Sequence, residues 1–130
     1  KIAEGFAQMR VAGALIEQYA DTKAFVNAMQ KYFKIDKVCD KDHLSDCFLA
    51  ETIKQTKDGN EEEFNVADIK TSANMNAGFE TESDVYGLVF ADGVSMLMTV
   101  DPDCTGPDSM QNGANADAGL TKCIKYLYDI

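Results

Sequence analysis

The sequence predicts an α+β fold in which an N-terminal amphipathic helix and a short second helix pack on an antiparallel sheet of three or slightly more strands. Three observations lead to this class. Apolar residues recur every three or four positions in 1–19, β-type runs occupy 85–90, 94–100 and 123–130, and Asp-Gly joins the first two of these runs. Since the helical pattern precedes the strands, we expect one face of the sheet to pack on the helices.

Residues 1–19 form the first expected helix. Gly5 and Gly13 lie inside it, and each costs about 1 kcal/mol relative to alanine in a helix interior. The segment begins without a methionine or a capping residue, so we expect it to be the downstream part of a longer helix. The alternative is a frayed amphipathic helix on an ordinary domain. The apolar positions on its one face are Ile2, Phe6, Met9, Ala12 or Gly13, Ile16 and Tyr19.

A second helix is expected after Asp21, whose side chain can cap it. Its apolar face would run through Phe25, Met29 and Tyr32 or Phe33.

Three strands are expected to form an antiparallel meander. Asp92 and Gly93 connect the first two runs, and Asp-Gly between such runs is a strong hairpin signal. The third strand lies near the end of the chain, where apolar residues alternate from Ile124 to Ile130. In the second strand one face holds Val94, Met96, Met98 and Val100.

The segment 49–84 carries weaker signals. Residues 57–60 (Lys-Asp-Gly-Asn) indicate a turn, and the acidic triplet 61–63 indicates a solvated face. Phe64, Val66 and Ile69 could anchor a short strand or a helical turn, and we expect 72–78 to be an exposed loop.

The chain is expected to form one domain, because 130 residues suffice for a single core. Its net charge of −10 argues against nucleic-acid binding. Residues 1–38 carry six basic and four acidic groups, for +2, whereas residues 39–130 carry six and eighteen, for −12. The acidic part is expected to be a solvated or cation-binding surface.

Four cysteines form two sequence-local pairs. The spacing favours Cys39–Cys47 and Cys104–Cys123 disulfides, although four cysteines permit three pairings. Disulfides persist in oxidising compartments, so the protein is expected to be exported. His43 lies midway between Cys39 and Cys47, which leaves a structural zinc site as an alternative, but a fourth ligand is not evident.

Catalytic signals are weak, and we expect that the protein is not an enzyme. The one histidine, His43, lies in a polar loop, and the glycines form no phosphate-binding motif.

The order of elements resembles the type IV pilin-like proteins, especially the pseudopilins and minor pilins. The resemblance covers most of 1–48 and 85–130. It is carried by the truncated amphipathic helix, the second helix ending in YFKIDKVC, the Cys47-Phe48 pair, the hairpin YGLVFADGVSM and the terminal strand KYLYDI. The family's diagnostic N-terminus does not occur in the sequence, and 49–84 has no counterpart.

This resemblance implies that 1–130 is a single pilin-like globular head domain. Its function would be that of a structural subunit of a type IV pilus-like filament or a type II secretion pseudopilus. Its partners would be other pilin or pseudopilin subunits and, through a missing N-terminal segment, the inner membrane. Its location would be extracytoplasmic, facing the periplasm or in a cell-surface filament. The implied assembly residues are Ile2, Phe6, Met9, Val11, Gly13 and Ile16, divided between the chain's own sheet and neighbouring subunits.

The acidic loop 101–117 is a candidate calcium site, since calcium prefers six to eight oxygen ligands, and major pseudopilins commonly hold calcium in this region. No other cofactor is expected. The alternative is a surface loop tethered by Cys104–Cys123 that contacts partners. The candidate calcium ligands are Asp101, Asp103, Asp108 and Asp117.

A second hypothesis for the whole chain is a stand-alone secreted module that binds protein or glycan through 57–84 and 101–120.

Overall fold

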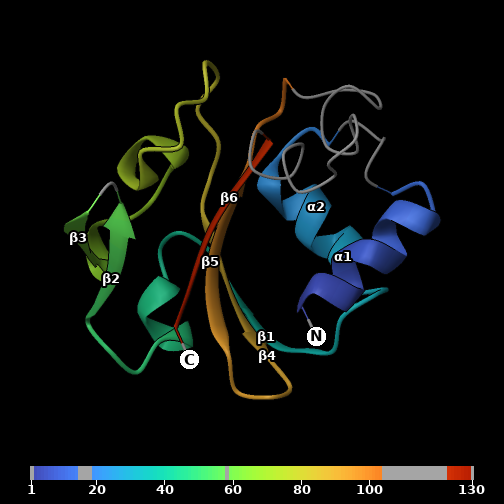
Figure 1. Ribbon diagram of the computed structural model, residues 1–130, viewed down its shortest axis with the longest axis horizontal. Coiled ribbons are helices and arrows are strands. Elements are labelled where there is room, and N and C mark those ends of the chain that lie inside the picture. Colours follow the sequence, from blue (N-terminus) through green and yellow to red (C-terminus); the bar gives the residue numbers. More distant parts are fainter. Residues whose placement is uncertain (1, 15–18, 58, 104–122, 130) are drawn as a thin grey trace.

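The computed structural model describes residues 2–14, 19–57, 59–103 and 123–129. Within these ranges the chain forms two helices, a four-stranded antiparallel sheet in the order β1-β4-β5-β6, and a separate β2–β3 hairpin. Figure 1 shows the sheet between two layers: α1 and α2 cover one face, and the β2–β3 hairpin with short helical turns covers the other. Mixed helix and antiparallel sheet is the α+β class that the sequence predicts.

The helices are α1, Ile2–Val11, and α2, Thr22–Met29. The four-stranded sheet contains β1, Ile35–Cys39; β4, Tyr86–Phe90; β5, Ser95–Val100; and β6, Ile124–Asp129. The hairpin contains β2, Thr52–Lys57, and β3, Asn60–Asn65. Three 3-10 turns complete the described elements: η1, Leu44–Cys47; η2, Val66–Asp68; and η3, Ser72–Met75.

The predicted meander is confirmed and gains a fourth strand. β4 and β5 pair through Leu88 and Met96, and Gly93 in their turn has a φ of 91°. β6 pairs with β5 along its whole length. Sequence analysis assigned no strand to 35–39, but these residues form β1 on the outer side of β4, with Cys39 opposite Gly87.

α2 begins where the sequence predicts. The Asp21 carboxylate accepts a hydrogen bond from the Ala24 N–H at 2.8 Å, which satisfies one of the free donors of the first turn. Phe25, Val26 and Met29 are buried on its inner side. The helix ends at Met29, one turn before the predicted Tyr32 or Phe33.

α1 is shorter than predicted. The helix ends at Val11, and Gly13 adopts the left-handed conformation with a φ of 79°. The Gly13 N–H donates to the Arg10 carbonyl at 3.0 Å, and the Ala14 N–H donates to the Met9 carbonyl at 2.8 Å. These two bonds are the Schellman arrangement that closes a helix. The interpretation of Gly13 as a helix-interior glycine, and of 1–19 as one continuous helix, is therefore wrong.

Replacing Gly13 with alanine should lower the free energy of unfolding by about 1 kcal/mol, because a Cβ is disfavoured in the left-handed region. Asparagine tolerates this region better, so Gly13→Asn should cost less. No heavy atom of the described residues lies within 4 Å of the added Cβ, so the cost comes from the backbone. Urea denaturation of both variants measures the difference. Equal stability of Gly13→Ala and the parent chain would contradict this helix end.

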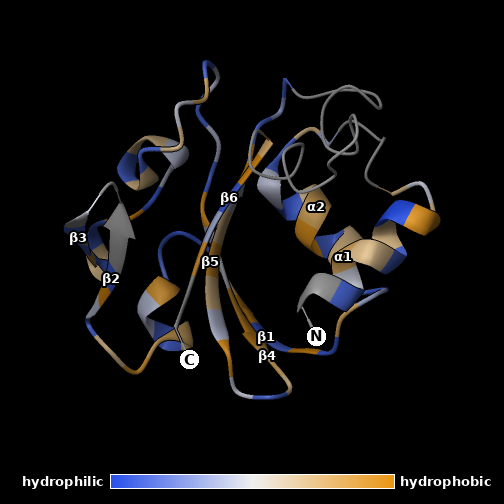
Figure 2. Ribbon diagram, in the orientation of Figure 1, coloured by the Kyte–Doolittle hydropathy of each residue, from blue (hydrophilic) through white to orange (hydrophobic). Residues whose placement is uncertain are grey.

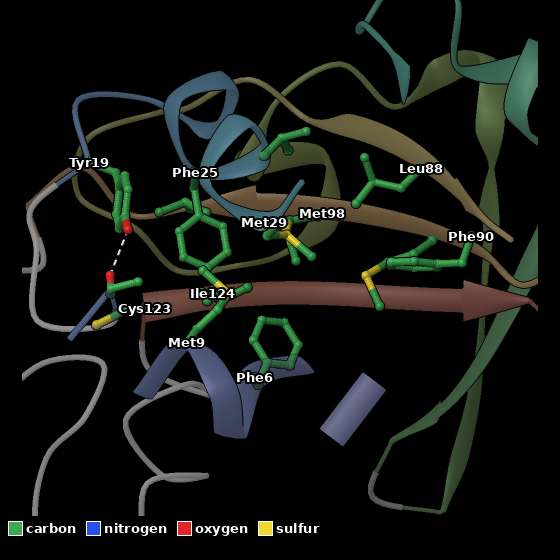
Figure 3. Close-up of a cluster of buried hydrophobic side chains, with 14 residues drawn as sticks. Phe6, Met9, Tyr19, Phe25, Met29, Leu88, Phe90, Met98, Cys123 and Ile124 are labelled. Atoms are coloured by element: carbon green, nitrogen blue, oxygen red, sulfur yellow. Dashed lines mark hydrogen bonds between the residues drawn. The ribbon is translucent and has the colours of Figure 1, made fainter. Parts of the chain in front are cut away.

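The first core lies between the helices and the sheet. Figure 3 shows Phe6 and Met9 of α1 facing Phe25 and Met29 of α2, with Ile124 of β6 among them. Met9, Phe25 and Met29 are fully buried. The predicted inward face of β5 is correct, since Met96, Met98 and Val100 are buried in this cluster and Val94 packs against it.

A second core covers the opposite face of the sheet. Leu97 of β5 and Leu127 of β6 project into it. Phe64, Val66 and Ile69, the predicted anchors of 49–84, are buried there in and beside β3 and η2. The sheet is therefore buried on both faces. The other residues of the cluster are Cys39, Leu44, Cys47, Phe48, Ile53, Met75 and Val85.

The predicted exposed loop at 72–78 is wrong in its first half. Ser72–Met75 forms η3, in which Ser72 and Met75 are buried. Met75 is an apolar anchor in the second core, and the Ser72 hydroxyl accepts a hydrogen bond from the Ser83 N–H at 3.0 Å. The predicted turn at 57–60 is confirmed, since it joins β2 to β3 with Gly59 at a φ of 79°.

Candidate functional site

The outer side of α1 carries an apolar strip. Ala7, Gln8, Val11 and Ala12 line a shallow groove of about 310 Å³. Val11 is 90% exposed, whereas Phe6 and Met9 on the inner side are buried. Figure 2 shows a hydrophobic segment next to a hydrophilic one at the far end of α1. We call Ala7, Val11 and Ala12 the outer strip. A surface helix usually presents polar residues on its outer side, so α1 departs from that pattern.

A second hollow lies beside the first turn of α1, and we call it the aromatic pocket. It has a volume of about 350 Å³. Its walls come from the first turn of α1, the segment after α2 and the β4–β5 turn. The lining residues are Glu4, Tyr32, Phe33, Lys34, Phe90, Ala91 and Asp92.

Phe33 connects the aromatic pocket to the first core. Its ring packs edge-on against Phe6 with centroids 5.3 Å apart, and lies 5.6 Å from the Phe90 ring. A Cβ on Gly5 would overlap the Phe33 ring, so glycine is what allows α1 to approach so closely. Sequence analysis gave Gly5 the cost of a helix-interior glycine, and the structure adds the aromatic ring that occupies the space of a Cβ.

The predicted assembly residues have different surroundings. Phe6 and Met9 are buried inside the chain's own core, and Gly13 lies just past the end of α1. The backbone of Ile2 begins α1, but the structure does not describe its side chain. Ile16 lies outside the described residues. Val11 is the one of the set with an exposed side chain among those described.

The predicted Cys39–Cys47 disulfide is confirmed. It joins β1 to η1, with the two Cα atoms 6.2 Å apart and both residues buried. Gly87 of β4 lies against it, where a Cβ would come within 3.2 Å of the Cys47 Cβ. Cys123 is buried and disulfide-bonded, but its predicted partner Cys104 lies outside the described residues.

The zinc alternative at His43 does not fit this arrangement, because Cys39 and Cys47 are bonded to each other rather than free as thiolates. His43 instead pairs with Asp40, with Nδ1 and Oδ1 2.7 Å apart. This hydrogen bond raises the pKa of His43 and lowers the pKa of Asp40. Both side chains are exposed, so the pair is a surface feature.

The candidate calcium loop is only partly described. The Asp103 N–H donates to the Asp101 carboxylate at 2.9 Å, which makes a tight local turn. Asp108 and Asp117 lie outside the described residues, so calcium binding stays a prediction. In the parts of the chain that are described, no three His, Cys, Asp or Glu side chains gather as metal ligands.

Sequence analysis did not identify the aromatic pocket. The apolar face of the second helix was expected to include Tyr32 or Phe33, yet both lie beyond the end of α2, are half-buried and line the pocket. Both rings also pack against the first core, and the adjacent aromatic pair was the available signal, since it offers more apolar surface than one helix face needs.

Comparisons of the chain with known protein families, curated proteins and solved structures find no match. Across the described ranges, neither helix is long and apolar enough to span a bilayer. Function is therefore inferred from the chain's own residues.

Proposed function

We propose that the chain is the head of a non-catalytic, pilin-like structural subunit that assembles into a filament through the outer side of α1. The observation that carries the proposal is the outer strip. Val11 is almost fully exposed, and Ala7 and Ala12 extend its apolar surface along the helix. Single exposed apolar residues are ordinary, but a grooved apolar strip on a helix favours a covering partner.

The inner side of α1 supports the same function. Phe6 and Met9 hold the helix on α2 and the sheet. A helix fixed in this way can present its other side to a neighbouring subunit without losing its place on the head. The α+β class and the antiparallel β4–β5–β6 meander agree with the pilin-like architecture that the sequence resembles.

The Cys39–Cys47 disulfide supports an extracytoplasmic location, because disulfides persist in oxidising compartments. The acidic residues outside the first third of the chain would then contribute to partner choice through charge. Calcium binding by the loop at 101–117 remains part of this proposal.

Replacing Val11 with aspartate should strongly reduce assembly without unfolding the head. Burial of a valine side chain contributes about 1.5–3 kcal/mol, so the fraction of subunit in filaments should fall by about tenfold or more. The measurement is the amount of full-length gene product in filaments sheared from its own host cells. Leu49→Asp is the matched control, since Leu49 is fully exposed in the segment between the second-core residue Phe48 and β2. Undiminished filaments with Val11→Asp would refute assembly through α1.

The gene upstream of Lys1 separates this function from the stand-alone binding module. A filament subunit requires an apolar segment of roughly 20 residues directly before Lys1, enough to span a bilayer. A cleavable signal peptide with its cut site at Lys1 would favour the free module instead.

A further inference from the structure

We propose that the aromatic pocket receives the C-terminal end of α1 from a second copy of the chain, with Arg10 of one copy pairing with Glu4 of the next. This inference rests on the proposed function and adds to it a specific contact between subunits.

The pocket has the chemistry to bind a cation on an apolar stem. Tyr32, Phe33 and Phe90 supply aromatic surface, and aromatic faces attract guanidinium groups. The charged residues on its lining are Glu4, Asp92 and Lys34, so its formal charge is −1. Glu4 is exposed at its edge and makes no ion pair with any described residue.

The end of α1 offers the complementary group. Arg10 is exposed in the last turn, beside Val11, and it also makes no ion pair within the described ranges. Arginine combines a long apolar stem with a planar cation that stacks on aromatic rings and pairs with carboxylates. Arg10 with Val11 therefore matches both the aromatic walls and the acidic edge of the pocket.

The two surfaces cannot meet within one copy, because they lie at opposite ends of the same rigid helix. Glu4 and Arg10 are separated by six residues, which places them about 9 Å apart along the axis and about 120° apart around the helix. Contact therefore requires another copy. A patch on one copy that meets a different patch on the next forms a head-to-tail contact, which gives an open filament when the rotation between copies does not close into a ring.

The test exchanges the two charges in the full-length gene product. Glu4→Arg and Arg10→Glu should each reduce sheared filaments by about tenfold, because like charges then face each other across the contact. The double variant Glu4→Arg/Arg10→Glu restores the pair and should recover at least about half of the parent amount. Asp68→Arg is the control, because Asp68 is exposed in η2, whose Val66 is part of the second core on the opposite face of the sheet.

Each outcome separates the contact from the broader function. Recovery in the double variant supports the pairing of Glu4 with Arg10. Loss in both single variants without recovery, or parent amounts in both, overturns it. If Val11→Asp still prevents assembly in that case, filament formation through α1 stands and only this contact fails. Melting midpoints of all variants are compared with the parent, because reversal places each charge at the less favourable end of α1.

Discussion

Replacing Phe25 with alanine should lower the free energy of unfolding by about 3–5 kcal/mol, the usual cost of removing a buried phenylalanine ring. Phe25 is completely buried at the centre of the first core. Its ring packs edge-on against Tyr19, with centroids 4.9 Å apart. Loss of the ring leaves a cavity between α2 and the sheet that neighbouring side chains fill only in part.

Urea denaturation under oxidising conditions measures this change, with the Cys39–Cys47 disulfide intact in every variant. Lys23→Ala is the matched control on α2, because Lys23 is exposed one residue after the start of the helix. The control should change the free energy by no more than about 0.5 kcal/mol. A Phe25→Ala variant as stable as the control would show that α2 does not pack on the sheet as described.

Removing the Cys39–Cys47 disulfide should cost about 2–4 kcal/mol. The two cysteines are eight positions apart, and closure of a loop of this length contributes about 2.5 kcal/mol in the chain-entropy account. Alanine is the better replacement at both positions, because a serine hydroxyl would be placed in the buried second core. The expected fall in melting temperature is about 6–16 °C for a chain of this size.

Calorimetry of the Cys39→Ala/Cys47→Ala double variant tests this prediction. The chain's other cysteines are left unchanged and oxidised, so the comparison isolates one bridge. The matched control is the surface variant Ser45→Ala, because Ser45 lies exposed within the same disulfide loop. A midpoint in the double variant within about 2 °C of the parent, less than 1 kcal/mol for this chain length, would mean that the bridge contributes little to the fold.

Local signals predicted the elements whose causes are local. Asp21 capped α2 as expected, and Asp92 with Gly93 marked the β4–β5 hairpin. The helix predicted over 1–19 was too long. Its apolar spacing continues past Val11, whereas the left-handed conformation of Gly13 ends α1 there. A glycine within a helical pattern can equally be an interior residue or a C-cap, and spacing does not distinguish the two.

Burial on both sides of the sheet was less accessible from the sequence. The positions of Met96 and Met98 on one face of β5 predicted the helix-side core, but Leu97 between them indicates a strand that is apolar on both faces. The residues that cover the second face come from 44–75, where short turns carry little periodicity. The sequence predicted Phe64, Val66 and Ile69 as anchors. It did not predict which face of the sheet they cover, because that depends on tertiary packing.

The candidate site was predicted in the same uneven way. Val11 was recognised as part of the helix that would contact neighbours, and it is exposed. The aromatic pocket combines Glu4, Phe33 and Phe90, which are far apart in the sequence. Only the packing of α1 on the end of α2 and on β4 brings them together, so residue spacing could not predict the pocket.

The early end of α1 determines how the head would respond to mechanical tension. α1 has ten residues, about 15 Å of rod, and beyond it the backbone turns at Gly13. A pull on the start of α1 would therefore act on the packed side chains of Phe6 and Met9 before it reaches the turn at Gly13. The packing of these two side chains, more than the backbone hydrogen bonds within α1, would set the force at which α1 separates from α2 and the sheet.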